Sequence, residues 1–138
     1  MVEGGKGGRY PFSHSLYVAD GGGFLVDAGS DPAEIDRLRQ DEGIAAVVMS
    51  HYHEDHFTFL PRLPGAEVWA SGPDAPAFES LETLLAWYAV LGTEWEAFYR
   101  RLLAEQLPFV PRHEARPLRE GEELRFGNTR AVATAVPR

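Results

Sequence analysis

Four side chains able to bind a metal ion, those of His51, His53, Asp55 and His56, fall within six consecutive positions of the sequence. Imidazole nitrogens and carboxylate oxygens are the ligands that zinc takes where thiolates are absent, and the chain has no cysteine. The alternative is a polar surface loop with a chance cluster of histidines. The density of the cluster favours a metal site.

The spacing of these residues predicts how they would share two ions. In extended backbone, side chains two positions apart point to the same side. His51 and His53 would then face one way, Asp55 would continue on that side, and His56 would turn to the other. We therefore expect one ion to receive two imidazoles and a neighbouring ion to receive a carboxylate and an imidazole.

The residues before the cluster predict the element that carries it. Residues 44–49 are continuously apolar and lie between Gly43 and Ser50, as is typical of a strand buried on both faces. Loops at the carboxyl end of such strands commonly hold the chemistry of α/β folds. Upstream, residues 13–20 and 24–27 flank three glycines and predict a hairpin. A helix should begin after Asp31 and end at Gly43.

The rest of the chain predicts further helices and strands. A short helix is expected over residues 57–63 and a strand over Glu67–Ser71. Apolar residues then recur at helical spacing through residues 74–107, with a break at Gly92 and a capping box at residues 93–96. We interpret this segment as a helical pair inserted between strands. Residues 117–137 are again typical of β structure, with a turn at Gly127.

Five aromatic residues lie in the inserted segment: Trp87, Tyr88, Trp95, Phe98 and Tyr99. Packing between the two helices and onto the sheet is the favoured interpretation. The alternative is a lid over the metal site that binds an apolar or acyl substrate.

Composition excludes several classes of function. The chain has 138 residues, 44% of them hydrophobic, and a net charge of −8, without a dense basic run. Nucleic-acid binding is disfavoured because phosphate backbones are bound by basic patches. The chain also lacks a secretory signal and any apolar stretch long enough to cross a bilayer. We expect a cytoplasmic protein with a small-molecule substrate and no membrane partner; the alternative is a mature secreted form whose signal has been removed.

The cluster resembles the signature of the metallo-β-lactamase superfamily, His-x-His-x-Asp-His after a buried strand. The family's preceding strand ends in Asp and Gly, which Asp27-Ala28-Gly29 matches in the right order. The resemblance implies an α/β fold of the αββα sandwich type. It also implies that His51 and His53 bind a first metal ion, that Asp55 and His56 bind a second, and that Asp27 supports them from behind.

The resemblance covers residues 1–138 as one domain but reaches only the N-terminal half of the family fold. Relatives add a third histidine, a bridging aspartate and a last histidine further on. We therefore expect a chain truncated before the C-terminal half, weak in metal binding and inactive alone, with an uncovered sheet face that favours a homodimer. Repair of the site by His14 or His113 is disfavoured.

For the intact protein, the resemblance implies a hydrolase with two zinc ions, although iron or manganese would also suit these ligands. An activated water would attack an ester, thioester, lactone or related small molecule, with Asp55 as the catalytic residue that orients it. His53 argues against the flavodiiron oxidoreductases, which have glutamate there. The role of Glu54 varies across such loops, and an exposed carboxylate without a function is the alternative. The alternative function is a non-catalytic metal-binding or interaction module of the same fold.

Overall fold

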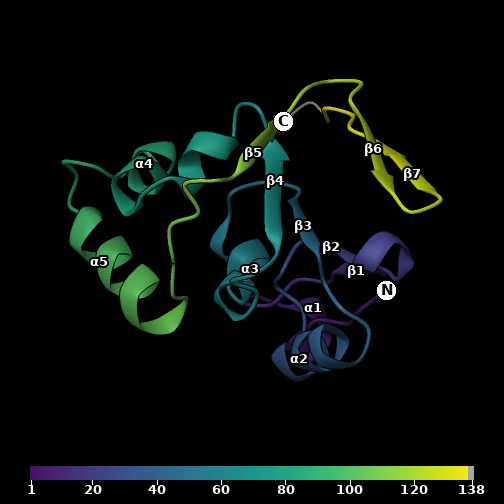
Figure 1. Cartoon of the computed structure of the whole chain (residues 1–138). Helices are drawn as coiled ribbons and strands as arrows, with labels where there is room; N and C mark the ends of the chain where they lie inside the picture. Colours follow the sequence, from purple (N-terminus) through teal and green to yellow (C-terminus); the bar gives the residue numbers. More distant parts are fainter. Residues whose placement is uncertain (137–138) are drawn as a thin grey trace.

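Five strands form the central sheet, in a computed structural model that describes residues 1–136 (Figure 1). The strands lie in the order β1-β2-β3-β4-β5. β1 is antiparallel to β2, whereas β2, β3, β4 and β5 are parallel to one another. Their bounds are β1 Leu16–Val18, β2 Phe24–Val26, β3 Ala46–Met49, β4 Glu67–Ser71 and β5 Arg116–Leu118. The predicted hairpin and the predicted strands at 44–49 and Glu67–Ser71 are confirmed.

The predicted helix after Asp31 is also confirmed, as α2 (Pro32–Asp41). Oδ1 of Asp31 accepts hydrogen bonds from the amides of Ala33 and Glu34, which would otherwise lack partners in the first turn. α2 buries Ile35 and Leu38, and the chain leaves it through Gly43, whose φ is +91°. The helix therefore joins β2 to β3 by a crossover that keeps both strands parallel.

The helix after the histidines begins earlier than predicted. α3 spans Glu54–Phe57 and is followed by the 3₁₀ turn η2 (Leu60–Arg62). His53 is still extended (φ −71°, ψ 145°), but the next residues are helical. The prediction that Asp55 continues on the side of His51 and His53 is therefore wrong, because a period of two applies only to extended backbone.

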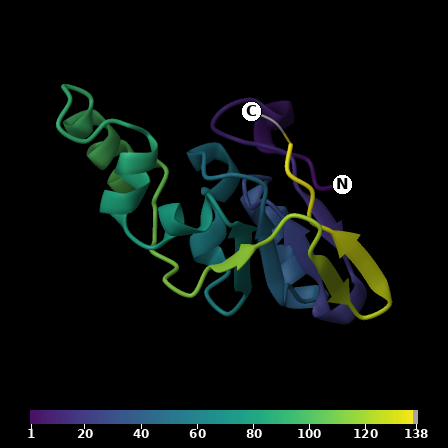
Figure 2. The same cartoon turned by 90° about the horizontal axis from the view of Figure 1, so that it is seen from above.

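Helices occupy the segment between β4 and β5, as predicted. They are η3 (Ala75–Phe78), α4 (Leu81–Trp87), α5 (Glu96–Arg101) and the π-helical turn η4 (Leu102–Gln106). The predicted capping box differs in detail, since the carboxylate of Glu96 accepts from the amide of Gly92 and not from that of Thr93. α4 and α5 project from one side of the sheet, away from the β6–β7 hairpin on the other side (Figures 1 and 2).

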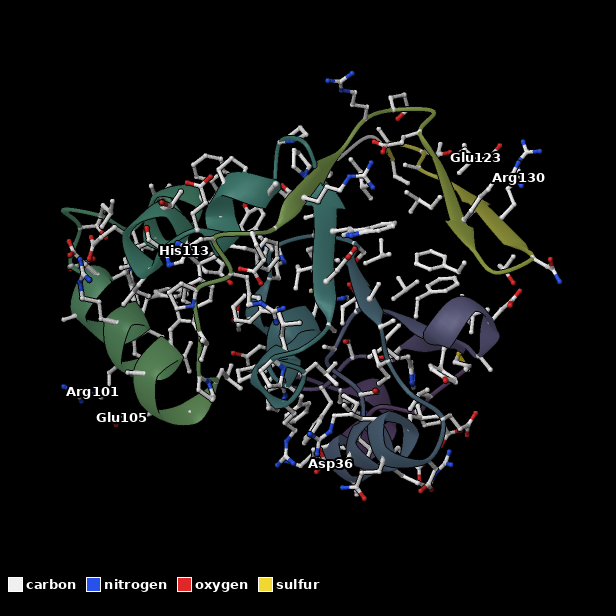
Figure 3. The ribbon with its side chains drawn as sticks, viewed as in Figure 1. Asp36, Arg101, Glu105, His113, Glu123 and Arg130 are labelled. Atoms are coloured by element: carbon white, nitrogen blue, oxygen red, sulfur yellow. The ribbon has the colours of Figure 1, made fainter. Side chains whose placement is uncertain are left out.

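The hairpin consists of β6 (Glu123–Phe126) and β7 (Thr129–Val132), and Glu123 and Arg130 form an ion pair across it (Figure 3). It packs on one sheet face, where the ring of Phe126 stacks on Phe24 with 3.9 Å between centroids. The β structure predicted for the tail is confirmed up to Val132. Pro137 and Arg138, at the end of the predicted tail, lie outside the described residues.

The other sheet face holds the larger core. Leu25, Val47 and Val68 are register partners on β2, β3 and β4, and all three are buried. Side chains of α2, α3 and α4 cover them. The molecule thus has the layered α/β arrangement that was predicted. Within residues 1–136, no helix is long and apolar enough to span a membrane.

Near the N-terminus, the single turn α1 (Gly5–Gly8) includes Lys6 and Gly7 with positive φ. The Val2–Ser15 bridge ties this segment to the residue just before β1.

Candidate metal centre

Asp27 is the polar anchor beneath the histidine cluster. It follows β2 directly and is 6% exposed. Its Oδ1 accepts from the Ser50 amide at 2.8 Å, and its Oδ2 accepts from the Ser50 hydroxyl at 2.7 Å. The same Oδ2 lies 2.8 Å from Nδ1 of His56. One buried carboxylate therefore holds both ends of the loop that carries the cluster.

These contacts define the ring nitrogens left for a ligand. An ionised carboxylate only accepts hydrogen bonds, so Nδ1–H of His56 donates to Asp27. The Ser50 hydroxyl donates to Asp27, so it accepts from Nδ1–H of His51, 2.9 Å away. When both rings are neutral, Nε2 carries the free lone pair in each. This is the arrangement found behind metal-binding histidines.

The two histidines differ in pKa. Burial, followed by repulsion from His56 and His53, lowers the pKa of His51. Burial, the largest single influence, would lower the pKa of His56 as well. The hydrogen bond and the charge of Asp27, together with the charges of Asp55 and Glu54, outweigh burial and raise that pKa. His51 is therefore the more readily available as a neutral ligand.

Hydrogen bonds from the residue after Asp27 and from the Ser13 side chain hold the start of α3 in place. The amide of Ala28 donates to the carbonyl of His56 at 2.7 Å, and the Ser13 hydroxyl donates to the carbonyl of Asp55 at 3.0 Å. Gly29 lies directly under Asp55, and a methyl group there would overlap the Asp55 carbonyl oxygen. The Asp-x-Gly sequence thus combines a carboxylate for the histidines with the space that the loop needs.

The structure gathers the four predicted ligands in one place. The ring centroids of His51 and His53 are 4.7 Å apart, and those of His51 and His56 are 4.1 Å apart. Oδ2 of Asp55 lies 3.8 Å from Nε2 of His56. Nevertheless, no group of three His, Asp or Glu side chains within residues 1–136 is arranged to hold one ion. The donors fit a metal in kind and in proximity but do not enclose one, and the ligand assignment stays a prediction.

The remaining histidines lie outside this cluster. His14 is exposed, and its Nδ1 accepts from the amide of Gly4 in the N-terminal segment. His113 is exposed on the segment before β5 (Figure 3). Two surface hollows, of about 620 and 470 Å³, also lie elsewhere, along residues 116–122 and between the N-terminus and α2.

Glu54 has a role that sequence reasoning missed. Tyr10 and Tyr88 each donate a hydrogen bond to its carboxylate, so the alternative of an exposed carboxylate without partners does not hold. Burial and then the charge of Glu54 raise the pKa of Tyr10 to about 12. The same two causes raise the pKa of Tyr88, where the hydrogen bond to Glu54 adds more than its charge. Nothing in the sequence around Glu54 signals these partners, which are 44 and 34 residues away.

Comparison with known proteins agrees with this geometry. Residues 9–137 match the family model of the metallo-beta-lactamase superfamily, and the chain belongs to this superfamily. The resemblance seen in the motif is thereby confirmed. No curated protein matches the chain significantly.

Among solved structures, the crystal structure of TTHA1623 in a di-iron-bound form is similar to this chain, with a TM-score of 0.53 and 26% sequence identity. The match covers 80% of this chain and 51% of that chain. The chain therefore spans about half the length of this structural relative.

Proposed function

We propose that the chain supplies one side of a two-metal site in a hydrolase. The observation that carries the proposal is the hydrogen-bonded group of Asp27, Ser50, His51 and His56, which leaves an Nε2 lone pair free on each histidine. His51 and His53 would hold the first ion, and Asp55 and His56 the second. When bound, such ions activate a water and polarise the oxygen of the bond to be cleaved.

The residues of the chain have separate tasks in this proposal. Asp55 lies at the start of α3, where its carboxylate would orient the attacking water and pass a proton to the leaving group. Asp27 would keep the histidine rings in place from below. This division is typical of metal sites, in which outer carboxylates orient the ligands.

Zinc is the metal we propose, and iron is the alternative to be tested. Imidazole and carboxylate ligands suit both ions. The di-iron form of TTHA1623 supports a site for two ions and gives iron particular weight.

The proposed substrate is a small ester, thioester or lactone with an apolar part. The inserted helices support this choice, since Trp95 and Phe98 are 57% and 56% exposed. Their rings contact each other, and Phe98 contacts Tyr99, which lies against Tyr88 beside His53. An apolar group bound near the cluster would find aromatic surface there.

A second candidate is a metal-binding or interaction module without catalysis. It is favoured by the finding that no three donor side chains within residues 1–136 close around one ion. Catalytic zinc commonly has three protein ligands.

Metal analysis and a substrate screen separate the candidates. The purified 138-residue chain, and any longer product of its gene, would be loaded with Zn²⁺ or Fe²⁺, dialysed, and assayed for metal content and for hydrolysis of esters, thioesters and lactones. For the 138-residue chain alone we expect weak metal binding without hydrolysis, and for a longer product we expect bound metal and hydrolysis. Metal should be lost in the His51→Ala/His53→Ala variant and retained in the matched His14→Ala/His113→Ala control. Bound metal without hydrolysis in every product tested would support the second candidate, and absence of metal would contradict both.

A further inference from the structure

Glu54 joins three parts of the molecule that are distant in sequence. Oε1 accepts from the hydroxyl of Tyr10, in the N-terminal segment, at 3.0 Å. Oε2 accepts from the hydroxyl of Tyr88, which follows α4. The backbone amide of Glu54 also donates to the Tyr88 oxygen at 3.0 Å. Since a carboxylate only accepts, both hydroxyls donate to it. The Tyr88 hydroxyl also lies 3.4 Å from the carbonyl oxygen of Tyr52, a longer contact beside its two bonds to Glu54.

The ring fixed in this way lies against His53. The rings of Tyr88 and His53 stack with 6.0 Å between centroids and an interplanar angle of 17°. Tyr52 meets both rings edge-on, and Tyr99 supports Tyr88 at 5.2 Å. The Tyr88 ring is therefore held on several sides, and it provides a flat surface for the imidazole.

His53 needs such a support more than the other two histidines of the cluster. Nδ1 of His51 is bonded to Ser50, and Nδ1 of His56 is bonded to Asp27. In the described part of the chain, by contrast, no hydrogen bond orients the His53 ring, whose contacts are with the rings of His51, Tyr52 and Tyr88. An imidazole without a polar partner depends on packing for its rotamer.

We propose that Glu54 is a positioning residue of the metal centre, which orients the His53 ring by fixing the Tyr88 ring against it. The inference rests on the proposed function, because it takes His53 as a metal ligand. In this proposal the inserted helices have two roles: they offer aromatic surface to a substrate, and they support the metal ligand His53. The supporting carboxylate then lies inside the signature itself, between His53 and Asp55.

The test has one readout that needs no metal and one that does. Histidine ring resonances are recorded by NMR at a fixed alkaline pH in the metal-free protein, for the wild type, Glu54→Gln, Tyr88→Phe and the double variant. Glu79→Gln is the matched control, since Glu79 is exposed on the surface and its replacement removes the same charge. Co²⁺ affinity is then measured by optical titration for the same proteins.

We expect Glu54→Gln and Tyr88→Phe to shift the ring resonances of His53 and to leave those of His14 and His113 in place. Each should weaken Co²⁺ binding about tenfold, as is typical for the loss of an outer support. The double variant should bind Co²⁺ with the same affinity as the single variant that binds it less tightly, because both substitutions break the same connection. Glu79→Gln should match the wild type in both measurements.

The inference is overturned if the His53 resonances are the same in Glu54→Gln and the wild type, or if the two substitutions weaken Co²⁺ binding additively. If the wild type itself binds no Co²⁺, the proposed function fails, and the NMR comparison still decides whether Glu54 orients His53. Tyr88→Phe retains the aromatic ring, so it tests the hydroxyl connection without opening a cavity.

Discussion

Oδ2 of Asp27 and Nδ1 of His56 lie 2.8 Å apart and link the end of β2 to the first turn of α3. Asp27 adopts a φ of +60°, a conformation that favours glycine and that aspartate tolerates better than most residues. A carboxylate that is buried, conformationally constrained and bonded to both Ser50 and His56 is built to hold its partners in one arrangement.

Replacement of Asp27 by Asn should weaken metal binding 10- to 100-fold, by the usual effect of an outer carboxylate on its histidine. The amide NH₂ would face either the Ser50 backbone amide, or both the Ser50 hydroxyl and Nδ1 of His56, so at least one of the present hydrogen bonds would be lost. Titration with Zn²⁺ or Co²⁺ measures the effect. Asp41→Asn, on the exposed end of α2, is the control, and an equal loss in both variants would contradict the assigned role.

Replacement of Gly29 by Ala should destabilise the protein by about 1–3 kcal/mol, the usual range for overpacking. The added methyl group would overlap the backbone carbonyl of Asp55 and crowd the hydroxyl of Ser13, so α3 must shift. Urea unfolding gives the free energy. Gly65→Ala is the control, because nothing lies within 4 Å of a methyl group there. Equal stability of the two variants would show that the β2 end and α3 are less closely packed than described.

Replacement of Arg112 by Met should cost about 1–3 kcal/mol through buried acceptors left without partners. Arg112 is 7% exposed, and its guanidinium donates to the carbonyls of Leu63 and Ala66 just before β4. Arg101→Met serves as the control, since Arg101 is on the outer side of α5 (Figure 3). The midpoint of thermal unfolding should be clearly lower for Arg112→Met than for Arg101→Met. Coincident unfolding curves would rule out a structural role for Arg112.

Tyr10 should ionise late in an alkaline titration followed by phenolate absorbance. Burial and the negative charge of Glu54 disfavour its phenolate and raise its pKa from the usual 10.0 to about 12. Glu54→Gln removes the charge and should lower that pKa towards 10.0, whereas Glu79→Gln should leave it unchanged. The unfolded chain loses this proton first, so the Tyr10 contact should also make stability fall as pH rises from 10.0 to about 12. An unchanged titration in Glu54→Gln would contradict the contact.

Local sequence patterns predicted the elements of the site well. β3 was evident from its uninterrupted apolar run, and α2 from Asp31 and Gly43, because these signals depend on neighbours in the chain. The order of Asp27 and the histidine cluster likewise allowed the superfamily to be identified. None of these predictions required knowledge of contacts between distant residues.

The features that were missed depend on such contacts. α3 begins at Glu54, where Ser13 and Ala28 bind the carbonyls of Asp55 and His56, and no pattern within residues 51–56 indicates those partners. Burial of Arg112 depends on carbonyls 46 and 49 residues away. The exposure of Trp95 and Phe98 could not be predicted from the sequence either. Helical spacing shows that one face of a helix is apolar but does not show what covers that face.

The span of the hydrogen bonds around Asp27 has a consequence for the order of folding. Its bonds to Ser50 and His56 join residues 23 and 29 positions apart, and contacts that close short loops form early. The hydrogen-bond partners of the His51 and His56 rings all lie within residues 13–59. Tyr88 lies outside that segment, so the support of His53 also requires α4 to be in place.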